Sequence, residues 1–293
     1  MAILTVLKMK SCLNDKGTLV LKIVSADVTE NLNECCPAIK LFKEYSLSSN
    51  GDSVVLFLQD DFTLSMYIID NDGDDNMLEV ASNVTDVASC QQGTFILSQG
   101  HSLYLQKGLA PRSPGKSIKI AENIAKIGTD TVSYIYYITL DGQLFLYNLD
   151  DDMEIYIDDN VLNASLTNVN GYHIVGYQKD DVLCWYNLKS GEMEIYDQEE
   201  IGKFVCFGNY LYLFPKDDSY VIRYSFSGQR QKSKLAFNPD NIKRLEVDDY
   251  IKLYTNNNSL YTFDGNTLEK VHDCTLGYFD FGEVQFNLKP IEF

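Results

Sequence analysis

The densest group of oxygen-bearing side chains is the run Asp-Asn-Asp-Gly-Asp-Asp-Asn at positions 70–76. Hard cations such as Ca²⁺ bind carboxylate and amide oxygens, so this run is a candidate calcium loop. The EF-hand spacing is absent, because its glycine would fall at Asp75 and its final glutamate at Ala81. Aspartate, asparagine and glycine also build β-turns. We interpret the run as a wide turn and predict no bound metal and no cofactor.

Paired aspartates recur at one equivalent turn of the repeat described below. Aspartate fills turns routinely, which is one interpretation. The other is an acidic arc on one face that docks a basic segment of a partner. The pairs are Asp60 and Asp61, Asp180 and Asp181, and Asp217 and Asp218. A second candidate contact is the long loop that carries Arg112 and Lys116, because extended loops on a rigid scaffold often bind partners.

Residue patterns for catalysis are few. The chain has no Gly-x-Ser-x-Gly elbow, P-loop or GxGxxG motif, and we predict that it is not an enzyme. Its three histidines lie far apart in sequence, and His173 is interpreted as a hydrogen-bonded strand residue. Seven cysteines fit neither a zinc site nor a secreted disulfide framework, so we predict reduced thiols. Cys184 and Cys206 alternate with core positions, which predicts buried and inert thiols.

The overall charge limits the classes of partner. The net charge of −18 opposes binding to nucleic acid, which needs lysine and arginine against phosphate. No apolar run approaches the roughly 20 residues of a membrane span, and the N-terminus lacks the basic region of a signal peptide. These features predict a monomeric protein of the cytoplasm or nucleus without membrane insertion. The acidity favours either solubility alone or a basic peptide partner.

A repeat of about 40 residues organises the chain. Residues 147–156 and 186–196 are near copies, and a tyrosine recurs with gaps of 37, 43, 39, 38 and 37 residues. The tyrosines are Tyr67, Tyr104, Tyr147, Tyr186, Tyr224 and Tyr261. Each lies in the second strand of a hairpin, with a third strand after it and a fourth run that opens the next unit. Repetition in every unit favours a tyrosine that packs between neighbouring units, its hydroxyl near a turn.

Four strands per repeat are typical of a propeller blade. We therefore predict an all-β fold in a single domain, residues 1–293, with blades at 38–81, 82–121, 122–157, 158–197, 198–237 and 238–271. The chain ends, 272–293 and 1–37, are each incomplete and together supply one more unit. The expected fold is a β-propeller of seven four-stranded blades, the last closed by strands from both termini. The segment 29–37 is the least regular and is a candidate short helix or loop.

The repeat resembles divergent WD40-like propellers over essentially the whole chain, although the Gly-His and Trp-Asp pairs are missing. The segment 140–145 also loosely resembles propellers of the regulator-of-chromosome-condensation type. Divergent WD40-like propellers are similar to modules of tethering, coat, pore and kinetochore complexes. The resemblance implies a non-catalytic scaffold that binds a peptide or a partner subunit through its rim or a loop. A propeller enzyme with a channel-mouth site is one alternative, disfavoured because the opening strands read as apolar. A nucleotide-exchange factor for a small GTPase is another.

Overall fold

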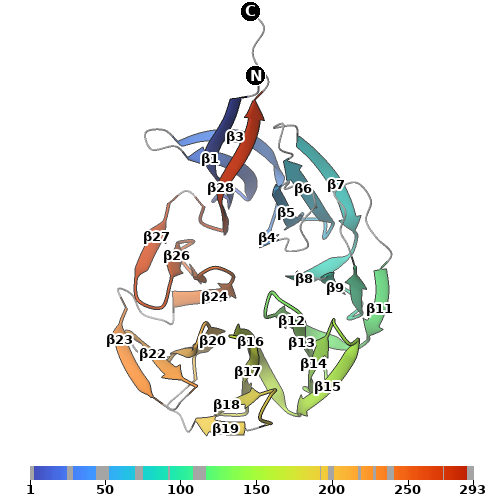
Figure 1. Ribbon diagram of the computed structural model, residues 1–293, viewed down its shortest axis with the longest axis vertical. Coiled ribbons are helices and arrows are strands. Elements are labelled where there is room, and N and C mark those ends of the chain that lie inside the picture. The colour runs from blue at the N-terminus through green and yellow to red at the C-terminus, as the bar shows by residue number, and fades with distance from the viewer. Residues whose placement is uncertain are drawn as a thin grey trace, which may run out of the picture.

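The computed structural model describes residues 3–24, 29–43, 53–69, 75–91, 93–107, 117–191, 193–196, 201–216, 219–226, 229–235, 241–272 and 274–288. The strands form seven antiparallel sheets of four strands each, arranged around a central axis like the blades of a propeller (Figure 1). The all-β, seven-bladed fold expected from the repeat is confirmed.

Six blades follow the chain from an inner to an outer strand. Blades 1 to 3 contain β4 (Lys40–Lys43), β5 (Ser53–Leu58), β6 (Leu64–Ile69) and β7 (Asp75–Ala81); β8 (Val84–Cys90), β9 (Gly93–Ser98), β10 (Leu103–Gln106) and β11 (Ser117–Ala121); and β12 (Ile124–Thr129), β13 (Tyr134–Thr139), β14 (Leu144–Asn148) and β15 (Met153–Asp158). Blades 4 to 6 contain β16 (Val161–Val169), β17 (Tyr172–Lys179), β18 (Val182–Asn187) and β19 (Met193–Tyr196); β20 (Lys203–Phe207), β21 (Tyr210–Phe214), β22 (Tyr220–Ser225) and β23 (Arg230–Lys234); and β24 (Ile242–Val247), β25 (Ile251–Thr255), β26 (Leu260–Phe263) and β27 (Leu268–Val271).

The seventh blade joins the two ends of the chain. Its inner strand is β28 (Gly277–Leu288), followed outward by β1 (Ile3–Leu13), β2 (Thr18–Val24) and β3 (Thr29–Pro37). β28 pairs with β1 along its whole length, and Figure 1 shows the two side by side. Closure by both termini is therefore confirmed, with β28 as the innermost strand of the blade.

The segment 29–37 is a strand, so the helix or loop considered for it is wrong. β3 pairs with β2, but the register shifts twice, between Thr18 and Val20 and between Leu21 and Lys22. Each β-bulge changes which face the following side chains occupy. An alternating pattern is broken by such shifts, which explains why the sequence looked irregular.

The recurring tyrosine lies in the third strand of its blade and packs against the preceding blade. Tyr67 belongs to one buried cluster with Leu13 and Leu21 of blade 7. Tyr147 meets the ring of Phe95 edge-on, with centroids 5.9 Å apart. Its hydroxyl donates to Asp152 in the next turn, at 3.2 Å. The interpretation of this tyrosine as an interblade packing residue is confirmed at these two positions.

Main-chain hydrogen bonds also join consecutive blades. The turn between the second and third strands contains a residue with positive φ, at Gly17, Phe62, His101 and Gly142. Its carbonyl accepts a hydrogen bond from an N–H at the start of the inner strand of the next blade, or two residues before it in the case of Ala38. The pairs are Ala38 to Gly17 (2.8 Å), Val84 to Phe62 (2.9 Å), Ile124 to His101 (2.9 Å) and Val161 to Gly142 (2.8 Å).

A disulfide bond between Cys12 and Cys274 corrects the expectation that every thiol is reduced. The two cysteines are 262 residues apart, and the closing blade brings them together. Both are buried against Val20, Tyr254 and Leu260. Spacing along the chain cannot reveal such a pair, because ring closure alone places Cys12 of β1 beside the segment that leads into β28.

We expect the Cys12→Ser/Cys274→Ser variant to unfold at a lower temperature than the wild type, with a loss of up to about 5 kcal/mol, since the bond closes a very long loop. Thermal melts with and without reductant measure this. Reductant should lower the wild-type Tm and leave the variant unchanged. A wild-type Tm that is insensitive to reductant, with full reduction verified by thiol titration, would contradict the expectation.

Candidate functional site

Strand direction sorts the turns of the propeller onto two faces. Within each blade the strands alternate in direction, so the turns between second and third strands lie on one face. The connections from each outer strand to the next inner strand lie on the same face. We call it the upper face, and the opposite one the lower face. The upper face is the one on which the sequence places its aspartate pairs.

The described aspartate pairs occupy the turns expected of them. Asp60 and Asp61 lie between β5 and β6, and Asp180 and Asp181 lie between β17 and β18. All four are exposed. Asp217, Asp218, Arg112 and Lys116, together with residues 70–74 of the candidate calcium loop, lie outside the described residues.

Sequence reasoning missed two further members of this arc. Asp15, between β1 and β2, and Asp141, between β13 and β14, are exposed in the equivalent turns of blades 7 and 3. The signal for both was present, because Asn-Asp-Lys-Gly and Leu-Asp-Gly are turn sequences in a hairpin. We call the six described residues the acidic arc: Asp15, Asp60, Asp61, Asp141, Asp180 and Asp181.

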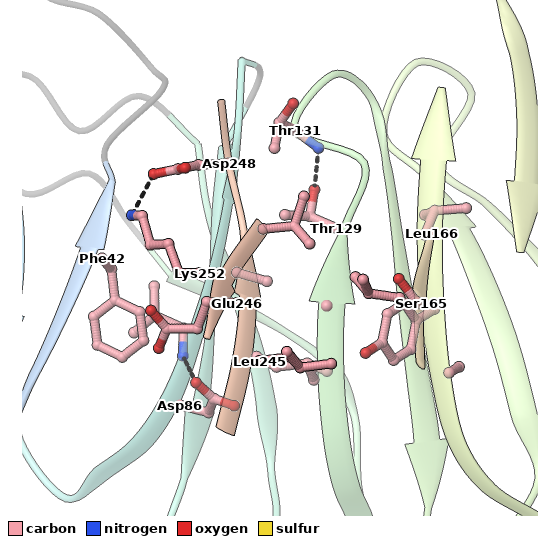
Figure 2. A pocket seen from close by; sticks show the side chains of 18 of the residues that line it. Phe42, Asp86, Thr129, Thr131, Ser165, Leu166, Leu245, Glu246, Asp248 and Lys252 are labelled. Carbon is pink, nitrogen blue, oxygen red and sulfur yellow. Dashed lines mark hydrogen bonds and ion pairs between the residues drawn. The ribbon is translucent and has the colours of Figure 1, made fainter. Parts of the chain in front are cut away.

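A cavity of 320 Å³ lies in the central channel, between the inner strands of blades 1 to 6 (Figure 2). Six charged side chains line it: Lys40, Asp86, Lys203, Glu246, Asp248 and Lys252. The sequence-based view of the opening strands as mainly apolar is therefore wrong for the channel. The inner strands β8, β12, β16 and β24 each shift register after their first residue. Such bulges redirect side chains, and they place a polar residue third in each strand: Asp86, Lys126, Asn163 and Arg244.

Every carboxylate lining the cavity has a partner. Asp86 pairs with Lys40 across blades 1 and 2, with Nζ 2.6 Å from Oδ1. Glu246 accepts a hydrogen bond from the Tyr254 hydroxyl at 2.7 Å. The first contact joins two neighbouring blades, and the second joins two strands of blade 6.

The most buried of these pairs closes the lower part of the channel. Lys252 approaches Asp248 to 2.5 Å, and their side chains are only 2% and 8% exposed (Figure 2). A buried ammonium is tolerated only beside such a partner. Removing the Lys252 side chain would take away the ammonium that faces the Asp248 carboxylate in this buried pair.

Tyr136 reaches the channel from the second strand of blade 3, over a glycine in the inner strand. A Cβ built on Gly128 would lie 2.3 Å from Cε1 of Tyr136. Burial, and then the nearby Asp86 carboxylate, raises the pKa of the Tyr136 phenol well above its ordinary value. The hydroxyl therefore remains a hydrogen-bond donor at neutral pH.

His173 makes an interblade clamp on the lower face. Its Nδ1 lies 2.6 Å from Oδ2 of Asp130 in blade 3, and its ring rests against Tyr134. The other oxygen of Asp130 accepts three backbone N–H groups, from residues 132 to 134. Both carboxylate oxygens are thus committed to structure, in agreement with the interpretation of His173 as a hydrogen-bonded strand residue.

The remaining chemistry of the described residues is limited. Cys184 and Cys206 are buried as expected, and burial raises the pKa of the Cys206 thiol to about 12, which disfavours the reactive thiolate. Among the described residues, no three His, Cys, Asp or Glu side chains are grouped to hold a metal. The same part of the chain contains no helix with the length and hydrophobicity needed to cross a membrane.

We expect Gly128→Ala to lower the free energy of unfolding by about 1–3 kcal/mol, because the new methyl group collides with the Tyr136 ring. Denaturant titration measures the change. Gly100→Ala is the matched control, since its nearest neighbour would lie 3.8 Å from the added Cβ. Equal stability of the two variants would show that Tyr136 can leave the channel at no cost.

Comparison with known proteins supports the fold alone. No family model and no curated protein sequence matches the chain. Among solved structures, human WBSCR16 is similar with a TM-score of 0.57 and 9% identity over 80% of this chain and 79% of that one. AztD from Citrobacter koseri is similar with a TM-score of 0.55 and 10% identity over 92% and 83% of the two chains.

Dihydro-heme d1 dehydrogenase NirN, in a complex with DHE, is a third similar structure, with a TM-score of 0.53 and 11% identity over 96% of this chain and 75% of that one. The architecture is thus found in an enzyme as well as in other proteins, and it does not by itself decide between catalysis and binding. What the fold and the comparisons together establish is that this chain is a divergent seven-bladed β-propeller.

Proposed function

We propose that this protein is a non-catalytic scaffold that binds a basic segment of a partner protein on its upper face, as one subunit of a larger complex. The observation that carries the proposal is the acidic arc. Its six carboxylates come from blades 7, 1, 3 and 4, and none pairs with a lysine or arginine among the described residues. A row of uncompensated acids favours the approach of lysine and arginine side chains and steers their encounter.

Apolar side chains stand among these acids. Phe62 is 39% exposed in the turn that holds Asp60 and Asp61, and Leu140 is 53% exposed beside Asp141. Exposed apolar groups within a charged rim are typical of protein-binding surfaces, where they supply buried contact area. They favour a partner segment that mixes basic with apolar residues over a purely polycationic one.

A groove beside the arc offers room for such a side chain. It has a volume of 630 Å³ between blades 1 and 2, and uncharged side chains line it, including Tyr104, Gln106 and Ser117. Asn83 also lines it and precedes Val84, whose N–H donates to the Phe62 carbonyl at 2.9 Å. Tyr104 is half-exposed there, whereas Tyr67 and Tyr147 are buried at their blade junctions. A neutral groove beside acidic turns favours a partner segment in which an uncharged side chain, bound in the groove, comes directly after a basic residue, bound by the acidic turns.

The channel also favours binding over catalysis. Asp86, Glu246 and Asp248 are each engaged with a neighbouring side chain. A general base needs a carboxylate that can reach a substrate proton, and these three are held elsewhere. A non-catalytic role is therefore supported by the hydrogen bonds and ion pairs that these three carboxylates already make, and does not depend on the lack of a catalytic motif.

Selection from a displayed library of short random peptides tests the proposal. We expect the purified protein to enrich peptides with several lysines or arginines and at least one large apolar residue. Asp60→Lys/Asp180→Lys should weaken the binding of an enriched peptide by about tenfold or more, because like charges then meet. Raising the salt concentration should weaken binding to the wild type, since exposed charges are screened.

Glu79→Lys/Glu269→Lys is the matched control. It makes the same charge change on the exposed outer strands β7 and β27. Enrichment of neutral or acidic peptides, or equal weakening by both double variants, would count against a basic partner on the upper face.

A further inference from the structure

Among the described residues that line the central channel, one lysine has no carboxylate partner. Lys40, Lys203 and Lys252 line the cavity, as do Asp86, Glu246 and Asp248. Lys40 is paired with Asp86 and Lys252 with Asp248. Glu246 is engaged by Arg244 and Tyr254, which do not line the cavity. Within the described chain, Lys203 has no carboxylate partner.

A second lysine adds to the positive charge near Lys203. Lys126, in the inner strand of blade 3, donates from Nζ to the Leu162 carbonyl of blade 4 at 2.7 Å. Desolvation by the surrounding chain, and then the positive charge of Lys203, lower the pKa of Lys126. The ammonium groups of Lys126 and Lys203 therefore repel one another electrostatically at the upper end of the channel. This local positive charge occurs in a protein whose net charge is −18.

Uncharged hydrogen-bond donors line the same cavity. The Tyr136 hydroxyl has no hydrogen-bond partner among the described residues, and neither does the Asn163 side chain. Ser165 also lines the cavity, but its oxygen accepts the Cys206 N–H at 2.8 Å and its side chain is hydrogen-bonded to the Cys206 thiol. These residues come from blades 3 and 4, and Lys203 from blade 5.

We propose that Lys203, Tyr136 and Asn163 form a binding site for the oxyanion of a small ligand, a phosphate or a carboxylate. An ammonium and several neutral donors facing one cavity supply the charge-assisted hydrogen bonds that such groups need. The volume of 320 Å³ is near the lower end of ligand pockets, which limits the ligand to a small molecule. The site lies in the channel and is independent of the partner segment proposed for the rim.

Calorimetric titration tests the site with two probes, inorganic phosphate and citrate, at constant ionic strength in a zwitterionic buffer. We expect the wild type to bind at least one of them at millimolar concentration or below. Lys203→Met and Tyr136→Phe should each weaken binding by about tenfold or more, the loss expected for a hydrogen bond to a charged group. The stronger probe distinguishes a phosphate from a carboxylate ligand.

Lys270→Met is the matched control, because it removes one exposed lysine from the outer strand β27. It should bind as the wild type does. Tyr136→Phe removes a single oxygen and retains the packing over Gly128, so it remains informative if Lys203→Met does not fold. The proposal is overturned if the wild type binds neither probe, if Tyr136→Phe or folded Lys203→Met binds as tightly as the wild type, or if Lys270→Met weakens binding equally.

Discussion

A hydrogen bond from an N–H at or just before the start of an inner strand to a turn carbonyl of the blade before it is the contact on which the ring depends. It occurs with the same geometry at four described junctions, from Gly17 and Ala38 to Gly142 and Val161. It uses only backbone atoms, so side chains can vary freely around it. Its requirement is a positive φ at the accepting residue, which glycine adopts without strain. Phe62 meets the same requirement in a conformation that a bulky side chain rarely takes.

These junctions bring the inner strands together, and polar side chains then join them around the channel. Asp86 binds Lys40 of the preceding blade, Lys126 binds the main chain of blade 4, and Ser165 accepts an N–H from blade 5. Because each contact gives a polar group of an inner strand a partner in the neighbouring blade, the contacts offset part of the desolvation cost of placing these groups around the channel.

The sequence was informative where one local pattern repeats and uninformative where distant segments meet. The tyrosine spacing was enough to predict the blades, because each tyrosine occupies the same place in a local four-strand unit. It could not reveal the Cys12–Cys274 bond, since nothing local links residues on either side of the closure. The charged channel was missed for another reason: a bulge after Val84 or Ile124 breaks the alternation from which strand faces are read. The arc was found at Asp60 and missed at Asp15, where only one aspartate marks the turn.

The acidic rim and the cationic centre of the upper face follow from different structural demands. Turns between second and third strands favour aspartate, asparagine and glycine, so acids collect at the periphery. The first residue of β20, Lys203, lines the channel and has no carboxylate partner among the described residues, whereas Lys40, the first residue of β4, lines it in a pair with Asp86. A charged partner would thus meet negative charge at the rim and positive charge near the central axis of the propeller. Exposed charges more than about 8 Å apart are largely screened at physiological ionic strength, so rim and centre can act as separate sites. A basic segment on the rim and an oxyanion in the channel are therefore compatible on one face.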